Sequence, residues 1–243
     1  EHDRQLPQIE DAAIQRDILI SMDQTDYALI YRGGRPRPDR QFWITDSRDK
    51  EVRDYKIYMT TVVEPLLYYF VTSIPYSLIM NMDTTTQLFL MRLLMVMWSC
   101  GVIIISFKVG RHLYPDNPLP VIATSCLCFY PVFLHMGSIV SYDVLVNLLS
   151  ALLIFYLVKT YGSDITWFSV ILIGTILGTA LYTKAAALML LPGIILWGVL
   201  NGVKFQQWRD ITLKGSVILL IAFCIGGWWY ANNLWHSQNL IQY

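Results

Sequence analysis

The sequence predicts an all-α, polytopic membrane protein: a transmembrane helix bundle with a charged external first loop and an interfacial helix. Hydrophobic residues make up 55% of the 243 positions, and their runs reach the roughly 20 residues that cross a bilayer as a helix. Of the 36 acidic and basic residues, 22 lie in the first 57 positions, where no long apolar run occurs. Acidic and basic residues are equally numerous, so the net charge excludes no class of partner.

The uneven distribution of charge divides the chain into three regions. Residues 1–57 are predicted to form an external loop segment, residues 58–87 an interfacial helix with its connector, and residues 88–243 the transmembrane helix bundle. The sequence begins with Glu1 rather than Met and ends just after an apolar run. We therefore interpret the chain as a fragment of a longer protein.

The first apolar run, 64–80, is the least regular of the predicted helices. It is about 17 residues long and contains Pro65 and Pro75, so it suits a helix at the membrane interface better than a full crossing. Full spans are predicted at 88–109, 119–138, 141–159, 165–182, 186–203 and 215–234. None of these six is predicted to be broken, and the sequence shows no internal repeat.

Positive charge alternates between the predicted loops. Three loops are basic: the first is flanked by Lys108, Arg111 and His112, the second by Lys159, and the third by Lys204, Arg209 and Lys214. If the 64–80 helix does not cross, all three lie on the cytoplasmic side, as the positive-inside rule requires. Residues 1–87, the loops near 138–141 and 183–184, and the end of the last span then lie on the non-cytoplasmic side.

On this topology, polar residues that are distant in sequence converge on the non-cytoplasmic face. They are Glu64, Arg92, Asp143, Lys184, Asn232 and Asn233. An ionisable side chain costs at least about 2.5–3.5 kcal/mol in hydrocarbon, so one that persists near a span usually faces a cavity, a partner or a substrate. Arg92 and Lys184 suit an anionic lipid headgroup, and a carboxylate can deprotonate a hydroxyl nucleophile.

Each candidate also has an ordinary structural interpretation. Arg92 can snorkel to the interface, Asp143 can complement a helix dipole, and Lys184 can anchor a short connector. Glu64, just before Pro65, can simply start a helix. The four His residues show no metal-ligand spacing, so no metal ligand is assigned, and whether a divalent metal takes part stays open.

The chain carries an ordered set of short motifs from about residue 60 to 235. They are Glu64-Pro-Leu-Leu-Tyr-Tyr-Phe, Met91-Arg-Leu-Leu, Gly110-Arg-His-Leu-Tyr-Pro, Tyr130-Pro-Val-Phe-Leu, Ser141-Tyr-Asp143, Leu181-Tyr-Thr-Lys184 and Gly227-Trp-Trp-Tyr-Ala-Asn-Asn233. The first resembles the Pro-Pro-Leu-Tyr-Tyr helix of polytopic GT-C glycosyltransferases. The set as a whole is similar to the N-terminal half of that superfamily, which includes protein O-mannosyltransferases and aminoarabinose transferases.

The resemblance implies an enzyme that transfers a sugar, with inversion, from a polyprenyl-phosphate donor to an acceptor on the non-cytoplasmic face. In that superfamily an acidic pair in the first external loop is catalytic, and Glu1 or Asp3 stands where such a pair would end. Asp143 is the third catalytic candidate, and Arg92 and Lys184 would hold the donor phosphate. The remaining site candidates are Glu64, Asn232 and Asn233. The acceptor is not identified.

Two other classes of function stay open. A transporter would use intramembrane charges to line a permeation path, and a non-catalytic subunit or scaffold would use them to pair with membrane protein partners. Discontinuous helices and repeated halves would favour the transporter, and beyond the 64–80 helix the sequence predicts neither. No nucleic-acid motif or nucleotide-binding loop is present. The expected partners are therefore the lipid-linked donor and the bilayer.

Overall fold

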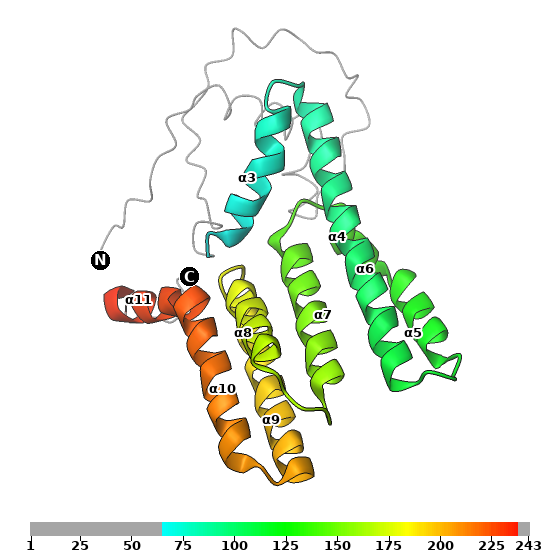
Figure 1. Cartoon of the computed structure of the whole chain (residues 1–243). Coiled ribbons are helices and arrows are strands. Elements are labelled where there is room, and N and C mark those ends of the chain that lie inside the picture. Colours follow the sequence, from blue (N-terminus) through cyan, green and yellow to red (C-terminus); the bar gives the residue numbers. More distant parts are fainter. Residues whose placement is uncertain (1–64, 238–243) are drawn as a thin grey trace, which may run out of the picture. The chain divides into compact units, whose positions relative to one another are not determined.

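The computed structural model describes residues 65–237, all within the compact unit Thr61–Tyr243 (Figure 1). These residues are helical throughout apart from short connections, and they contain no strand. The all-α prediction is therefore confirmed for this part of the chain. The predicted external segment 1–57 and the site candidates Glu1, Asp3 and Glu64 lie outside the described residues.

The helices follow one another with short connections. They are α3 (Leu67–Ile79), α4 (Thr84–Leu113), α5 (Leu119–Cys128), α6 (Pro131–Ser138), α7 (Tyr142–Thr160), α8 (Trp167–Leu181), the 3₁₀ helix η3 (Ala185–Leu190), α9 (Leu191–Phe205), α10 (Trp208–Ala222), the π-helix η4 (Phe223–Gly227) and α11 (Trp228–Ser237). Four continuous stretches are long and apolar enough to cross a membrane, and the bent pair α5 and α6 allows a fifth. This arrangement is consistent with an integral membrane protein.

The first two helices match the prediction in place and differ in length. Helix α3 has 13 residues and accommodates Pro75 without ending there, whereas α4 has 30 residues and begins before the predicted limit at 88. Asp83 explains the early start, because its Oδ2 accepts the backbone N–H of Thr86 at 3.0 Å and caps the helix. The hydrogen bonds from Thr86 also lower the pKa of Asp83.

The predicted span 119–138 is wrong as a single helix. It consists of α5 and α6, which meet at an angle of 57°. Pro131, the first residue of α6, has no N–H to continue the hydrogen bonding of α5, and it holds Tyr130 in an extended conformation. The proline therefore breaks the span, and the prediction of six unbroken spans is wrong here.

The predicted span 165–182 is also shorter than expected. Helix α8 has 15 residues, about 22 Å of helix, whereas a bilayer core is about 30 Å thick. Thr166 caps its start by accepting the N–H of Ser169 at 3.3 Å. The helix lies against both α7 and α10, and Val170, Ile173 and Leu177 are fully buried. Because it lies inside the bundle, α8 does not need to match the full thickness of the bilayer.

The last predicted span, 215–234, begins earlier and contains a π-helical turn. Helix α10 starts at Trp208, so the turn between α9 and α10 is only Gln206 and Gln207. Lys214, predicted to flank the third basic loop, lies within α10 and pairs with Asp210 one turn earlier at 2.6 Å. The π-helix η4 follows, and beyond it α11 turns away from the axis of α10 (Figure 1).

Glycines let α8 approach α10 and η4 closely. A Cβ on Gly174 would stand 3.0 Å from the Ile218 carbonyl oxygen, and one on Gly178 would stand 2.7 Å from the Ile225 Cβ. Gly174 and Gly178 are four residues apart and so share one face of α8. The pair is thus a Gly-x-x-x-Gly contact, the type that brings membrane helices together.

Contacts between the helices show which of their ends lie at the same end of the bundle. Helices α4 and α7 run parallel, because Met95 packs with Val144 while Gly101, further along α4, faces Leu148 further along α7. Their C-terminal ends, which carry the first two groups of basic residues, therefore lie toward the same end of the bundle. The third group joins them, since the backbone N–H of Gly162 after α7 binds Asn201 of α9 at 3.1 Å.

Candidate functional site

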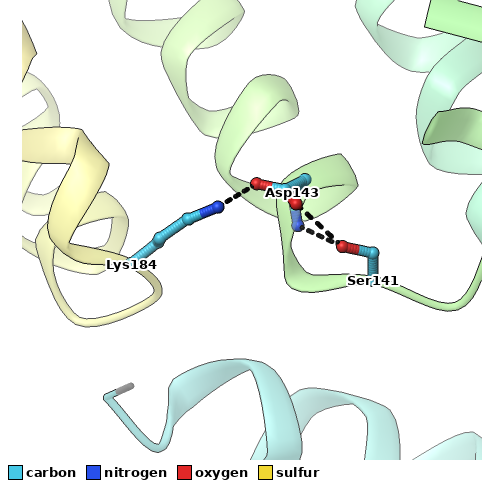
Figure 2. Close-up of polar contacts among 3 residues, drawn as sticks. All are labelled: Ser141, Asp143 and Lys184. Atoms are coloured by element: carbon cyan, nitrogen blue, oxygen red, sulfur yellow. Dashed lines mark hydrogen bonds and ion pairs between the residues drawn. The ribbon is translucent and has the colours of Figure 1, made fainter. Parts of the chain in front are cut away.

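The other end of the bundle holds an ion pair between Asp143 and Lys184 (Figure 2). Asp143 is the second residue of α7, and Lys184 immediately precedes η3. The two are 41 residues apart in sequence, and their side chains are 27% and 22% exposed respectively. The structure thus brings together a predicted catalytic carboxylate and a predicted phosphate-binding cation.

Ser141 fixes the position of the carboxylate. Its Oγ donates to Asp143 Oδ2 at 3.0 Å and accepts the Asp143 backbone N–H at 3.1 Å. Ser141 is the N-cap of α7, so the start of this helix and the orientation of the acid are set by the same side chain. The other carboxylate oxygen, Oδ1, receives the Lys184 amine (Figure 2).

Two tyrosines support the lysine. The Lys184 Nζ lies 4.6 Å from the centre of the Tyr142 ring, a cation–π contact. The ring of Tyr68 from α3 packs edge-on against that of Tyr142, with centroids 6.1 Å apart. Burial raises the pKa of Tyr68 to about 12, and its hydroxyl points to the Met95 sulfur 4.0 Å away. Helices α3, α4 and α7 therefore meet beside the ion pair.

Helices α8 and α11 reach the same end of the bundle. The Leu67 N–H donates to the Tyr182 carbonyl at 3.3 Å, two residues before Lys184, and the Tyr230 hydroxyl donates to the Leu181 carbonyl at 2.7 Å. The rings of Tyr182, Trp228 and Trp229 form a cluster with centroids 6.0–6.3 Å apart. The ion pair thus has an aromatic neighbourhood built from several helices.

The remaining described candidates are placed differently. Asn233 is buried, and it lies on the same face of α11 as Tyr230, whereas Asn232 is exposed. Arg92 is exposed on α4, about one turn before Met95. It forms no ion pair with any residue that the structure describes. Its proposed role in binding a phosphate therefore stays a prediction.

Sequence reasoning did not assign Ser141, Tyr142 or Tyr68 to the site. A signal existed for Ser141, because a serine directly before an apolar run that opens with an acid is typical of a helix N-cap. No comparable signal marks the two tyrosines, since the sequence holds 15. Only the packing of α3 on α7 distinguishes them. Within residues 65–237, no group of three or more His, Cys, Asp or Glu residues is arranged to hold a metal ion.

Comparisons with protein families, curated proteins and solved structures found no match to this chain. The ion-pair geometry and the motif resemblance are therefore the basis for a functional proposal.

Proposed function

We propose that the chain is the membrane part of a GT-C-type glycosyltransferase whose site is the Asp143–Lys184 pair. The observation that carries the proposal is the pairing itself, formed between the start of α7 and the segment after α8. Two charges that are only partly exposed at the end of an apolar bundle carry a solvation cost, which a role in binding or chemistry would explain. Inverting sugar transfer needs one acid–base group and one cation, and the pair provides both.

In the proposed reaction, Lys184 changes partners. Its amine binds the phosphate of the polyprenyl-linked donor, which competes with Asp143 for the same cation. The Asp143 carboxylate is then free to take the proton of the acceptor hydroxyl. The hydroxyl oxygen forms a bond to the anomeric carbon, and the bond from that carbon to the phosphate oxygen breaks. The electron pair of that bond leaves with the polyprenyl phosphate, whose charge Lys184 stabilises.

Tyr142 and Ser141 would keep the two groups in place during this exchange. The Tyr142 ring attracts the Lys184 ammonium whether or not Asp143 binds it. Ser141 holds the carboxylate through Oδ2 and leaves Oδ1 available once the lysine moves. The aromatic cluster of Tyr182, Trp228 and Trp229 offers apolar ring faces nearby.

The proposal predicts a large loss of activity when either charge is removed. Membranes that contain the full-length protein would be supplied with a radiolabelled polyprenyl-phosphate sugar, and release of polyprenyl phosphate would be measured. Asp143→Asn should lower the rate about 100-fold or more, the usual contribution of a general base. Lys184→Met keeps the stem and removes the charge, and it should cost roughly 10-fold or more, as expected for a charge-assisted contact.

A second Asp–Lys pair provides a matched control. Asp210 and Lys214 pair within α10 at the opposite end of the bundle. Asp210→Asn and Lys214→Met should therefore leave the rate within about twofold of the unmodified protein, since this pair lies within one helix and away from the proposed site. Unchanged rates for Asp143→Asn and Lys184→Met at normal expression would refute the proposal. Arg92→Ala in the same assay decides whether Arg92 belongs to the site.

A transporter is the second candidate, and two features favour it. Helix α5 meets α6 at a sharp bend, and the last span contains the π-helix η4. Discontinuous helices such as the α5–α6 pair line substrate and ion paths in many transporters, and π-helical turns are frequent at functional sites. The same assay distinguishes the two functions, because a transporter would leave the donor intact and release no polyprenyl phosphate.

A further inference from the structure

The end of the bundle opposite the Asp143–Lys184 pair contains two turns that are tied together. The Gly162 N–H, in the loop after α7, donates to Asn201 Oδ1 of α9 at 3.1 Å. Asn201 is fully buried, and its Nδ2 donates to the Trp197 carbonyl at 2.9 Å. Gly162 has a φ of 75°, which favours glycine, and a side chain there would collide with the Lys204 amine. The α7–α8 loop and the α9–α10 turn therefore form one unit.

Cations of α9 and α10 lie over aromatic rings at or next to the α7–α8 loop. The Lys204 Nζ is 5.1 Å from the centre of the Tyr161 ring, and the Lys214 Nζ is 6.0 Å from that of Trp167. Lys214 also binds Asp210, so its charge is largely compensated. Lys204 is exposed and has no carboxylate partner among residues 65–237. Its ammonium therefore keeps N–H groups free for an anion.

Arg209 lies on the other side of the same turn. It is exposed and has no ion-pair partner within the described part of the chain. Only Gln206 and Gln207 separate the helices that carry Lys204 and Arg209. The Trp208 ring packs directly against Gly202 of α9, because a Cβ on Gly202 would stand 2.5 Å from it. Two uncompensated cations thus flank one close-packed turn.

Exposed aromatic residues lie at the same end of the bundle as these cations. Tyr161, Trp167, Phe168 and Trp208 all expose large parts of their rings. Aromatic rings with a polar group concentrate at the level of lipid headgroups, where Lys and Arg meet phosphate. The nearby acids are Asp164, which is exposed, and Asp210, which is paired with Lys214. With Lys159 also at this end, the surface has an excess of positive charge.

We propose that Lys204 and Arg209 bind the phosphate of an anionic phospholipid at this surface, with Trp208 against the lipid between them. A lipid headgroup is favoured over a free anion because exposed apolar side chains, including Phe168 and Leu213, lie at the same end of the bundle. This site is separate from the proposed donor site, because α8 runs between the two ends. It does not depend on the glycosyltransferase proposal.

The test compares two lipids on the purified, full-length protein. Phosphatidylglycerol and phosphatidylcholine are added in equal amounts, and native mass spectrometry measures the ratio of the bound lipids. Lys204→Gln and Arg209→Gln should each lower the preference for phosphatidylglycerol about fivefold, the factor that corresponds to about 1 kcal/mol per cation near an anionic headgroup. Excess inorganic phosphate should not displace the lipid.

Lys108→Gln is the matched control, because Lys108 is exposed and belongs to another basic group at the same end. Its lipid preference should stay within about twofold of the unmodified protein. An equal loss in Lys108→Gln would show diffuse attraction instead of a site and would overturn the proposal. So would an unchanged preference in Arg209→Gln, a variant that removes no hydrogen bond or ion pair of the described chain. Displacement by inorganic phosphate would show a free-anion site.

Discussion

Asp143 and Lys184 hold each other through a contact that no local sequence pattern could provide. Each side chain is roughly three-quarters buried, so water screens the pair less than it screens a fully exposed one. The pair Asp210–Lys214 differs, because its acid is 45% exposed and the two residues are one helical turn apart. The Asp210–Lys214 contact joins two residues of one helix, whereas the first pair connects α7 to the segment after α8. Its loss should therefore affect tertiary structure.

We predict that the two pairs contribute differently to stability. Asp143→Ala should lower the stability of the purified protein in detergent by about 1–3 kcal/mol, less than for a fully buried pair because Lys184 can move its amine toward water. Asp210→Ala should cost about 0.3–0.5 kcal/mol. Thermal unfolding of the single and double variants would give the coupling energy of each pair. A coupling near zero for Asp143 and Lys184 would contradict a structural contribution of their contact.

At the scale of elements, the contact of α8 with α10 and η4 depends on positions that lack a side chain. A Cβ on Gly178 would meet the Ala222 Cα at 3.0 Å as well as Ile225, and one on Gly226 would collide with the Gly178 carbonyl. The helices cannot separate locally, because Ile218 and Leu177 are fully buried in the same core. A side chain at either glycine must therefore overpack the contact between α8 and its neighbours.

Gly178→Ala tests this close approach. The added methyl should destabilise the protein by about 1–3 kcal/mol through overpacking. Gly198→Ala is the control, because a Cβ there has no neighbour within 4 Å, so its better helix propensity should leave stability equal or raise it by up to about 1 kcal/mol. Thermal unfolding in detergent measures both. If the two variants had the same midpoint, the glycine contact would not limit the packing of α8.

The predicted bounds of the helices were accurate where the length of an apolar run alone determines where a helix begins and ends. Helix α7 and the combined stretch η3 and α9 lie close to the predicted spans 141–159 and 186–203. The errors have local causes: Pro131 breaks one span, and the Asp210–Lys214 pair with Trp208 extends another toward the charged turn. Average hydrophobicity does not detect either effect. The length of α8 could not be predicted, because it depends on the neighbours that enclose it.

The site was predictable in part for a similar reason. Counting spans places the start of α7 and the end of α8 at the same end of the bundle, so Asp143 and Lys184 were expected to be near each other, and they are in contact. Counting spans does not show in which direction a side chain faces around the axis of its helix. Arg92 was predicted at the same end of the bundle, but its side chain is exposed on α4. The Tyr142 ring lies beside Lys184 and packs against Tyr68, a contact that span counting does not predict.

At the scale of the whole molecule, the described helices separate two chemically different ends. One end has the Asp143–Lys184 pair and the Tyr182–Trp228–Trp229 cluster. The other has the basic residues near the C-terminal ends of α4 and α7 and around the α9–α10 turn. Large apolar side chains such as Phe89, Ile195 and Leu220 are exposed between the ends, as expected for surfaces that face lipid. Contacts within the bundle show which helix termini belong to each end, and the positive-inside rule assigns a side of the membrane to each end.

That assignment predicts opposite labelling at two serines. Ser138 ends α6, near the Asp143–Lys184 pair, and Ser163 lies in the loop beside Asn201; both are exposed. Cys100, Cys126, Cys128 and Cys224 form no disulfide, so they can first be replaced by alanine. In intact cells, an impermeant thiol reagent should label Ser138→Cys, and it should label Ser163→Cys only after the membrane is opened. Labelling of Ser163→Cys from outside would invert the topology, and the Asp143–Lys184 pair would then face the cytoplasm, where the proposed non-cytoplasmic acceptor could not reach it.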